Sequence, residues 1–132
     1  MSKWEARRQP EPPHPFPHSL ASDEWVILSG VAGFDPATGK IPEDAAAQAE
    51  AVINNSAWAL EAAGSSWAEV VFIKIHVSDR AHIETTDPVI RRMIPEPRPA
   101  SGGIIVTGLV SPDIKIEFDV WARRGAQRVQ VD

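Results

Sequence analysis

Apolar residues recur at helical spacing over residues 41–63, and this stretch is the clearest helix that the sequence predicts. Pro42 suits the first turn, and Gly64 is placed to end the helix. One stripe should face the core, at three- and four-residue spacing: Ala49, Ile53, Ser56, Leu60 and Ala63, with Val52 and Ala57 beside them.

Strand patterns occur at residues 24–31, 68–78, 103–109 and 114–123. The stretch 68–78 alternates, with Val71, Ile73, Ile75 and Val77 on one face and Phe72, Lys74, His76 and Ser78 on the other. In the last strand the apolar face holds Ile114, Ile116, Phe118, Val120 and Ala122, and the other face holds Lys115, Glu117, Asp119, Trp121 and Arg123.

A second, weaker helix is expected over residues 80–94, with Asp87 as cap, Pro88 in the first turn and Pro95 after the end. The expected order is strand, strand, helix, strand, helix, strand, strand. This order predicts an α+β fold in which two helices cover one face of a mixed sheet. The other face carries Phe72 and Trp121, so we expect a second copy of the chain to cover it.

Length and composition favour one domain of 132 residues. We expect an extended proline-rich leader at 1–16, a domain at 17–124 and a tail at 125–132. No apolar run approaches the roughly 20 residues that span a bilayer, and no signal-peptide pattern is visible, so we expect a cytoplasmic protein. The chain has no cysteine, which excludes thiolate chemistry, and its net charge of −5 disfavours nucleic-acid binding.

A set of short motifs, in this order and spacing, resembles the Rid (YjgF-type) superfamily of enamine and imine deaminases. The resemblance runs from about Pro17 to Arg123. The motifs are Ser29-Gly30, Asp35-Pro36-Ala37-Thr38-Gly39, Ala47-Gln48-Ala49, Glu61-Ala62-Ala63-Gly64, His76-Val77-Ser78-Asp79, Pro99-Ala100 and Ile114-Lys115-Ile116-Glu117. The resemblance implies a chorismate-mutase-like fold, a homotrimer with a central β-barrel, and ligand clefts between subunits.

The same resemblance implies the site residues. Glu117 aligns with the family's cleft glutamate, which holds and activates the attacking water, and is our candidate acid/base. Gly30 aligns with a Ser-Gly turn near the ligand, followed by Val31 where glutamine is frequent. His18 stands where a tyrosine is common, and Gly103 where a small residue or cysteine is. Gly102 and Gly103 offer backbone N–H groups to an oxyanion or ease the entry into a strand.

The family's carboxylate-binding arginine aligns with Ser101 in this chain. Serine does not reproduce the bidentate grip of a guanidinium, and losing a charged hydrogen bond costs about 1.5–3 kcal/mol. Carboxylate imines are therefore expected to be poor substrates. Arg98 lies three residues earlier, roughly 10 Å away along an extended chain, and can replace the arginine only if the loop curls.

Three functions are compatible with these residues. The first is a small-molecule enzyme that acts on an imine, enamine or related carbonyl intermediate, by hydrolysis or a related dehydration or cyclisation, with Glu117 as acid/base. The second is a non-catalytic binding or accessory trimer, and the third is an endoribonuclease-like role, which the acidic charge makes the weakest. No cofactor, metal or membrane partner is expected, and His14 and His18 lack the helical spacing of a metal pair.

Overall fold

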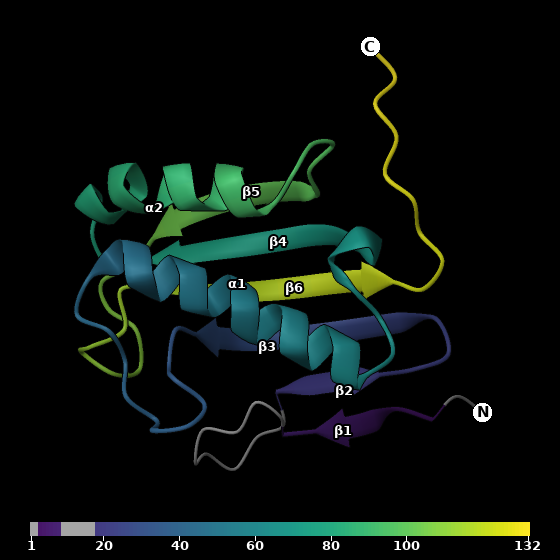
Figure 1. Ribbon diagram of the computed structural model, residues 1–132, viewed down its shortest axis with the longest axis horizontal. Coiled ribbons are helices and arrows are strands. Elements are labelled where there is room, and N and C mark those ends of the chain that lie inside the picture. The colour runs from purple at the N-terminus through teal and green to yellow at the C-terminus, as the bar shows by residue number, and fades with distance from the viewer. Residues whose placement is uncertain (1–2, 9–17) are drawn as a thin grey trace.

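The computed structural model describes residues 3–8 and 18–132. Its strands are β1 (Glu5–Arg7), β2 (Ser19–Ala21), β3 (Trp25–Ala32), β4 (Val70–Val77), β5 (Ala100–Ile105) and β6 (Ile116–Arg123). Its helices are α1 (Ala45–Ala62), α2 (Ala81–Met93) and the short 3-10 helix η1 (Trp67–Glu69). The strands form a single sheet in the order β1-β2-β3-β6-β4-β5 (Figure 1).

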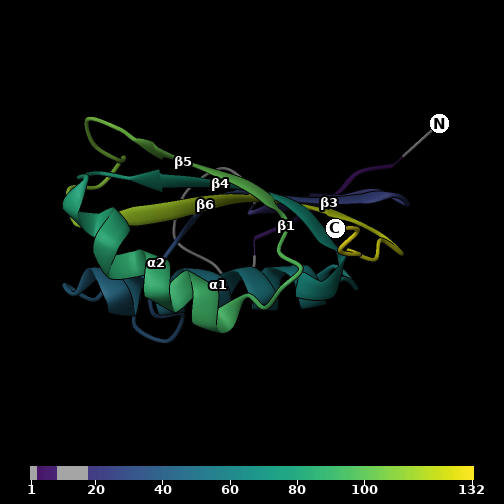
Figure 2. The same ribbon diagram turned by 90° about the horizontal axis from the view of Figure 1, so that it is seen from above.

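Both helices lie on the same face of this sheet (Figure 2). All neighbouring strands are antiparallel except β4 and β5, which are parallel and are connected through α2. The α+β class, the mixed sheet and the one-sided helix layer predicted from the sequence are therefore confirmed. We call the sheet face away from the helices the open face.

The helix α1 begins later than its apolar pattern suggests. The side chain of Asp44 accepts a hydrogen bond from the N–H of Ala47 at 3.0 Å, so Asp44 is the N-cap. Pro42 was expected in the first turn, and this was wrong. Its carbonyl instead accepts a hydrogen bond from Nε2 of Gln48 at 2.7 Å, which holds Pro42 in the preceding loop.

The helix α2 covers nearly all of the predicted residues 80–94, but the predicted cap at Asp87 was wrong, because Pro88 lies inside the helix. The N–H of Ala81 donates to Oδ1 of Asp79 at 2.8 Å, just before the helix. The carboxylate of Asp87 instead accepts a hydrogen bond from Nε of Arg91 at 2.7 Å on the helix surface. An Asp-Pro pair thus resembles a helix start in sequence, although about two turns of the helix precede Pro88.

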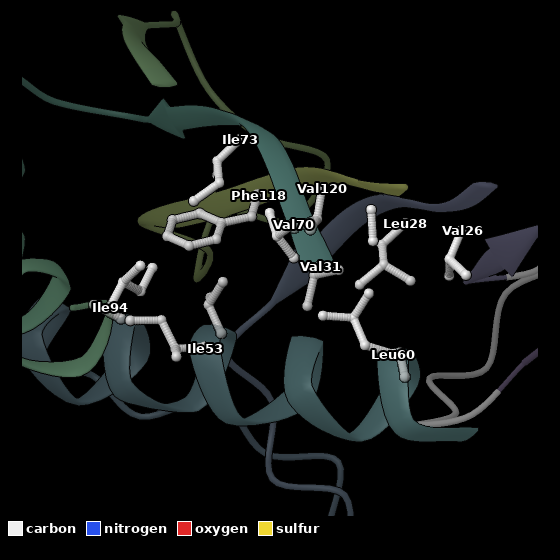
Figure 3. Packing of buried hydrophobic residues seen from close by; sticks show 14 of the residues in the cluster. Val26, Leu28, Val31, Ile53, Leu60, Val70, Ile73, Ile94, Phe118 and Val120 are labelled. Carbon is white, nitrogen blue, oxygen red and sulfur yellow. The ribbon is translucent and has the colours of Figure 1, made fainter. Parts of the chain in front are cut away.

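The core fills the space between the sheet and the two helices (Figure 3). The predicted α1 stripe of Ala49, Ile53, Ser56, Leu60 and Ala63 is buried, as is the predicted apolar face of β6. In β4 the core residue is Val70 instead of Val71, because a register shift between Val70 and Phe72 inserts one extra residue opposite β6.

The strand β5 occupies residues 100–105, earlier than the predicted 103–109. Its parallel pairing with β4 runs from Phe72 with Ala100 to Val77 with Ile105, so Gly102 and Gly103 lie within the strand. Glycines are rare in strand interiors, and the sequence pattern therefore started the strand too late.

The open face carries a row of apolar side chains that crosses the sheet. Paired positions place Leu20, Ile27, Trp121 and Phe72 next to one another on β2, β3, β6 and β4. Leu20 is 40% exposed and Trp121 is 41% exposed. Trp25 meets Trp121 edge to face, with ring centroids 5.8 Å apart. This apolar row is the surface for which the sequence suggested a second copy of the chain.

Part of the expected leader belongs to the sheet, because Glu5–Arg7 forms β1 and pairs with β2. His14 lies outside the described residues. In the described part of the chain, no helix is long and apolar enough to cross a membrane.

Candidate functional site

A bulge in β3 forms one wall of the site. Leu28 pairs with Val120 and Val31 pairs with Phe118, so Ser29 and Gly30 together face the single residue Asp119. Gly30 adopts a left-handed conformation with φ of 66°, which favours glycine. Its N–H donates to Oδ1 of Asp119 at 2.8 Å, and the Ser29 hydroxyl donates to the same atom at 3.4 Å. The Asp119 carboxylate therefore fixes the bulge.

Glu117 lies on the open face beside this bulge. It pairs with Ala32 of β3 on one side and with His76 of β4 on the other. A Cβ atom on Gly30 would lie 3.4 Å from Oε1 of Glu117, so the glycine leaves room for the carboxylate. Burial raises the pKa of the Glu117 carboxyl, His76 opposes this shift, and the Asp119 carboxylate adds to it. A carboxyl with a raised pKa is suited to accept and return a proton.

His76 lies on the open face next to Glu117 and Asp119. Its Nε2 lies 3.9 Å from Oδ2 of Asp119, and its side chain is 20% exposed. Its buried Nδ1 has no hydrogen-bond partner among the residues that the structure describes. An imidazole between two carboxylates can bind a polar group or relay a proton.

The sequence did not single out His76 and Asp119 as site residues. In the alternating patterns, His76 shares a strand face with Lys74, and Asp119 shares a strand face with Glu117. That alternation was the available signal, but only the pairing of β4 with β6 brings the two faces together.

Lys74 is a third residue that the sequence analysis did not assign to the site. It pairs with Asp119 on one side and with Gly102 of β5 on the other. A Cβ atom on Gly102 would lie 3.4 Å from Nζ of Lys74, so the ammonium lies over this glycine. Gly103 is paired with Ile75, whose side chain packs against the core.

His18 is buried, with 2% of its surface exposed, and its ring centroid lies 5.9 Å from that of Phe34. Its carbonyl accepts a hydrogen bond from the N–H of Ser29 at 3.3 Å, so its backbone adjoins the bulge. Val31 is only 1% exposed and packs in the core. The expectation that the Val31 side chain binds substrate is therefore corrected, because the bulge turns it toward the helices.

Ser101 does not lie on the face of Glu117 within one chain. It pairs with Ile73, whose side chain is buried in the core, so this position faces the helix side of the sheet. The residues that the resemblance places around one ligand are therefore divided between the two faces of a single sheet.

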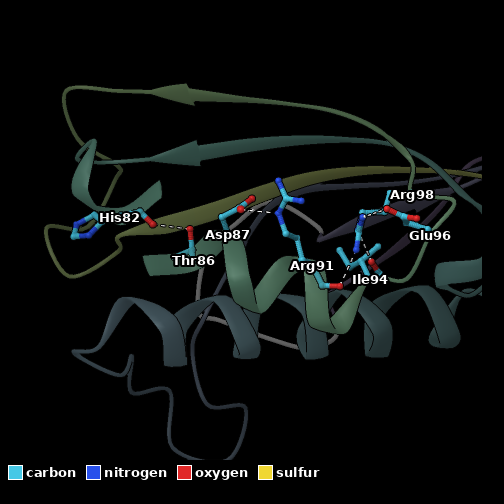
Figure 4. Close-up of polar contacts among 7 residues, drawn as sticks. All are labelled: His82, Thr86, Asp87, Arg91, Ile94, Glu96 and Arg98. Carbon is cyan, nitrogen blue, oxygen red and sulfur yellow. Dashed lines mark hydrogen bonds and ion pairs between the residues drawn. The ribbon is translucent and has the colours of Figure 1, made fainter. Parts of the chain in front are cut away.

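Arg98 binds the end of α2 (Figure 4). Its Nε donates to the Ile94 carbonyl at 2.7 Å, and its Nη2 donates to the Arg91 carbonyl at 2.9 Å. Nη1 contacts the Glu96 carboxylate at 3.1 Å. These contacts use the guanidinium as a cap for helix carbonyls and favour a structural role for Arg98 over a substrate-binding one.

A separate cavity of about 440 Å³ lies near the N-terminal end of α1. It is lined by Ile41, Pro42, Glu43, Pro112, Asp113 and Lys115, none of which is a predicted site residue. Within residues 3–8 and 18–132 there is no group of three or more His, Asp or Glu side chains that could hold a metal ion.

Comparison with known proteins extends the resemblance. The family model described as endoribonuclease L-PSP matches residues 6–124. The chain is 34% identical over 110 residues to 3-aminoacrylate deaminase RutC of Acinetobacter baylyi, covering 83% of this chain and 86% of that one. It is 32% identical over 105 residues to chloroplastic Reactive Intermediate Deaminase A of Arabidopsis thaliana, covering 78% of this chain but only 56% of that longer protein.

Solved structures agree with the sequence matches. The crystal structure of the Escherichia coli YjgF gene product has a TM-score of 0.81 and 28% identity, with 90% of this chain and 93% of that one covered. RidA from the Antarctic bacterium Psychrobacter sp. PAMC 21119 gives a TM-score of 0.83 and 27% identity, with 91% and 97% covered. The chain therefore belongs to the Rid (YjgF-type) superfamily, whose family model is described as endoribonuclease L-PSP.

Proposed function

We propose that this protein hydrolyses a small imine or enamine, or acts on a related carbonyl intermediate, with Glu117 as its acid/base. The observation that carries the proposal is the position of Glu117, half-buried beside the Gly30 bulge with a raised pKa. Relatives named as deaminases of 3-aminoacrylate and of 2-iminobutanoate and 2-iminopropanoate support the substrate class.

The chemistry needs one group that both accepts and donates protons. The Glu117 carboxylate accepts a proton from water as the water oxygen adds to the imine carbon, while the nitrogen gains a proton from the medium. The protonated Glu117 then donates to the amine nitrogen, and the C–N bond breaks with its electron pair on nitrogen. The hydroxyl loses its proton, so imine and water become a carbonyl compound and ammonia.

The proposed assembly is a homotrimer whose clefts lie between subunits. The exposed apolar row on the open face, with Leu20 and Trp121, supports a covering copy. The division of Glu117 and Ser101 between two faces also supports it, because only a neighbouring chain can bring both positions to one ligand. Analytical ultracentrifugation tests this assembly, and a stable monomer would contradict it.

Ammonia release tests the proposed reaction. The imine 2-iminopropanoate is generated in situ by an amino-acid oxidase, and its breakdown is compared for the wild type and Glu117→Ala. Because Ser101 replaces the family's arginine, we expect the wild type to hydrolyse this acid slowly but above background, and we expect a loss of at least about 100-fold in Glu117→Ala. Background rates for both proteins, on this acid and on an uncharged imine, would favour the non-catalytic binding trimer instead.

A further inference from the structure

Lys74 places a positive charge on the open face, on the strand next to that of the candidate acid/base. Lys74 and His76 are two residues apart on β4, so both project from the same side, about 7 Å apart along the strand. His76 is the direct partner of Glu117 on β6. The Lys74 backbone is therefore two residues from the direct partner of Glu117, and its Nζ is directed over Gly102 of β5, on the far side of β4 from Glu117.

The carboxylate nearest to Lys74 along the sheet is engaged elsewhere. Asp119 is the direct cross-strand partner of Lys74, yet its carboxylate binds the N–H of Gly30 and the hydroxyl of Ser29, and approaches His76. Among the residues that the structure describes, no acidic side chain lies within 4 Å of Nζ of Lys74. The cation is thus left without an ion pair although an acid stands opposite it.

Gly102 keeps the other side of the ammonium open. A side chain at this position would begin 3.4 Å from Nζ, so any larger residue would occupy the space beside the charge. The stem of Lys74 is half-buried, and Nζ lies 5.9 Å from the centre of the Phe72 ring. The stem is therefore confined by its neighbours while the charged end faces an open position above β5.

We propose that Lys74 binds the carboxylate of an acidic substrate over Gly102, in place of the arginine that Ser101 replaces. The inference rests on the proposed function for the identity of the substrate as a small imino or keto acid. A lysine ammonium attracts an anion as a point charge and lacks the planar fork of a guanidinium. The site should therefore bind carboxylates with less discrimination of their orientation than an arginine site would.

Binding of a stable keto acid tests the anchor without catalysis. The dissociation constants of 2-oxobutanoate and of the uncharged ketone butanone are measured by ligand-observed NMR for the wild type, Lys74→Met and Lys74→Arg. We expect Lys74→Met to bind the acid roughly 10- to 100-fold more weakly and butanone within twofold of the wild type. Lys74→Arg should retain the acid within about threefold. Equal acid affinity in wild type and Lys74→Met would overturn the proposal.

Lys40→Met is the matched control, because it removes one lysine charge from an exposed turn. It should bind the acid as the wild type does. An equal loss of acid affinity in Lys40→Met would assign the effect to net charge and overturn the proposal.

A second pair of variants places side chains of nearly equal shape at position 102, beside the Lys74 ammonium. Gly102→Asp should pair with Lys74 and bind the acid at least about tenfold more weakly than Gly102→Asn. Equal binding by this pair would also contradict the proposal.

The binding and ammonia assays separate the two proposals. Loss of acid binding in Lys74→Met together with no ammonia release by the wild type would support the role of Lys74 in binding and contradict the deaminase activity. Ammonia release with unchanged KM and kcat in Lys74→Met would support the deaminase activity and contradict the role of Lys74 in binding.

Discussion

The carboxylate of Glu117 lies against Gly30, so closely that a Cβ atom on the glycine would stand 3.4 Å from Oε1. The glycine has a positive φ, and its N–H is held by Asp119. One residue thus provides both the turn of the bulge and the space for the acid. Substitution can separate the two requirements, because Gly39 also has a positive φ but has nothing within 4 Å of an added Cβ atom.

Gly30→Ala should lower activity more than it lowers stability. Its left-handed conformation costs alanine about 1 kcal/mol, and the added methyl group would contact Oε1 of Glu117 and cover part of the carboxylate that the proposed reaction uses. Gly39→Ala is the control, because Gly39 has φ of 75° but nothing within 4 Å of the added atom. Urea denaturation should show similar losses for both, whereas ammonia release should fall at least about tenfold only in Gly30→Ala. Equal activities would contradict the contact.

Glu117→Gln should remove a pH dependence of folding. Because burial raises the pKa of Glu117 in the folded protein, the folded state binds more protons than the unfolded state above the ordinary value of 4.5. The contribution of this carboxyl to stability therefore decreases as pH rises from 4.5 through the raised pKa. Urea midpoints of Glu117→Gln should exceed those of the wild type at neutral pH, and the difference should vanish below pH 4.5.

The exposed residue Glu61 gives the control for this pH experiment, since Glu61→Gln removes one carboxylate from the surface. A gain in Glu61→Gln as large as that in Glu117→Gln would assign the effect to net charge. The pH profile of ammonia release should lose a titrating group in Glu117→Gln if the proposed reaction uses it.

Asn55→Ala should destabilise the fold, whereas Asn54→Ala should not. The buried side-chain amide of Asn55 donates to the carbonyls of Ala32 and Phe34 at 2.9 and 2.8 Å, which ties the end of β3 to α1. Leaving two buried carbonyls without donors costs about 2–4 kcal/mol. The neighbouring Asn54 is exposed. Chemical denaturation of both variants compares the two positions, and equal losses would contradict the assigned role.

Arg98→Met should weaken the end of α2 and leave ligand affinity unchanged. The guanidinium holds two helix carbonyls and the Glu96 carboxylate, so its removal should cost about 1–3 kcal/mol. The dissociation constant of 2-oxobutanoate should stay within twofold of the wild type. A tenfold weaker affinity of Arg98→Met for 2-oxobutanoate would indicate that Arg98 binds the substrate.

The sequence predicted those elements whose core face repeats regularly. The α1 stripe from Ala49 to Ala63 and the alternation in β6 depend on local spacing, which tertiary contacts did not override. Strand β5 was shifted because its apolar signal begins after Gly102 and Gly103, whereas parallel pairing with β4 already starts at Ala100. Strand pairing over a long separation decides such a boundary, and a local window does not contain it.

The site was predictable only in part for the same reason. Glu117 and Gly30 could be located by resemblance to a family, because each stands in a short motif. Val31 was assigned to the wrong environment because the bulge changes the strand phase by one residue. Lys74 entered no motif, since its relation to Gly102 exists only in the paired strands.

The bulge in β3 also separates the needs of the fold from those of the chemistry. Val26, Leu28 and Val31 face the core, and the sheet needs only one residue between the last two to keep this alternation. The second residue of the Ser29-Gly30 pair is thus surplus to the fold. Removing Ser29 would leave a regular strand with every core residue in register, so the candidate site depends on one residue of chain length that the fold does not need.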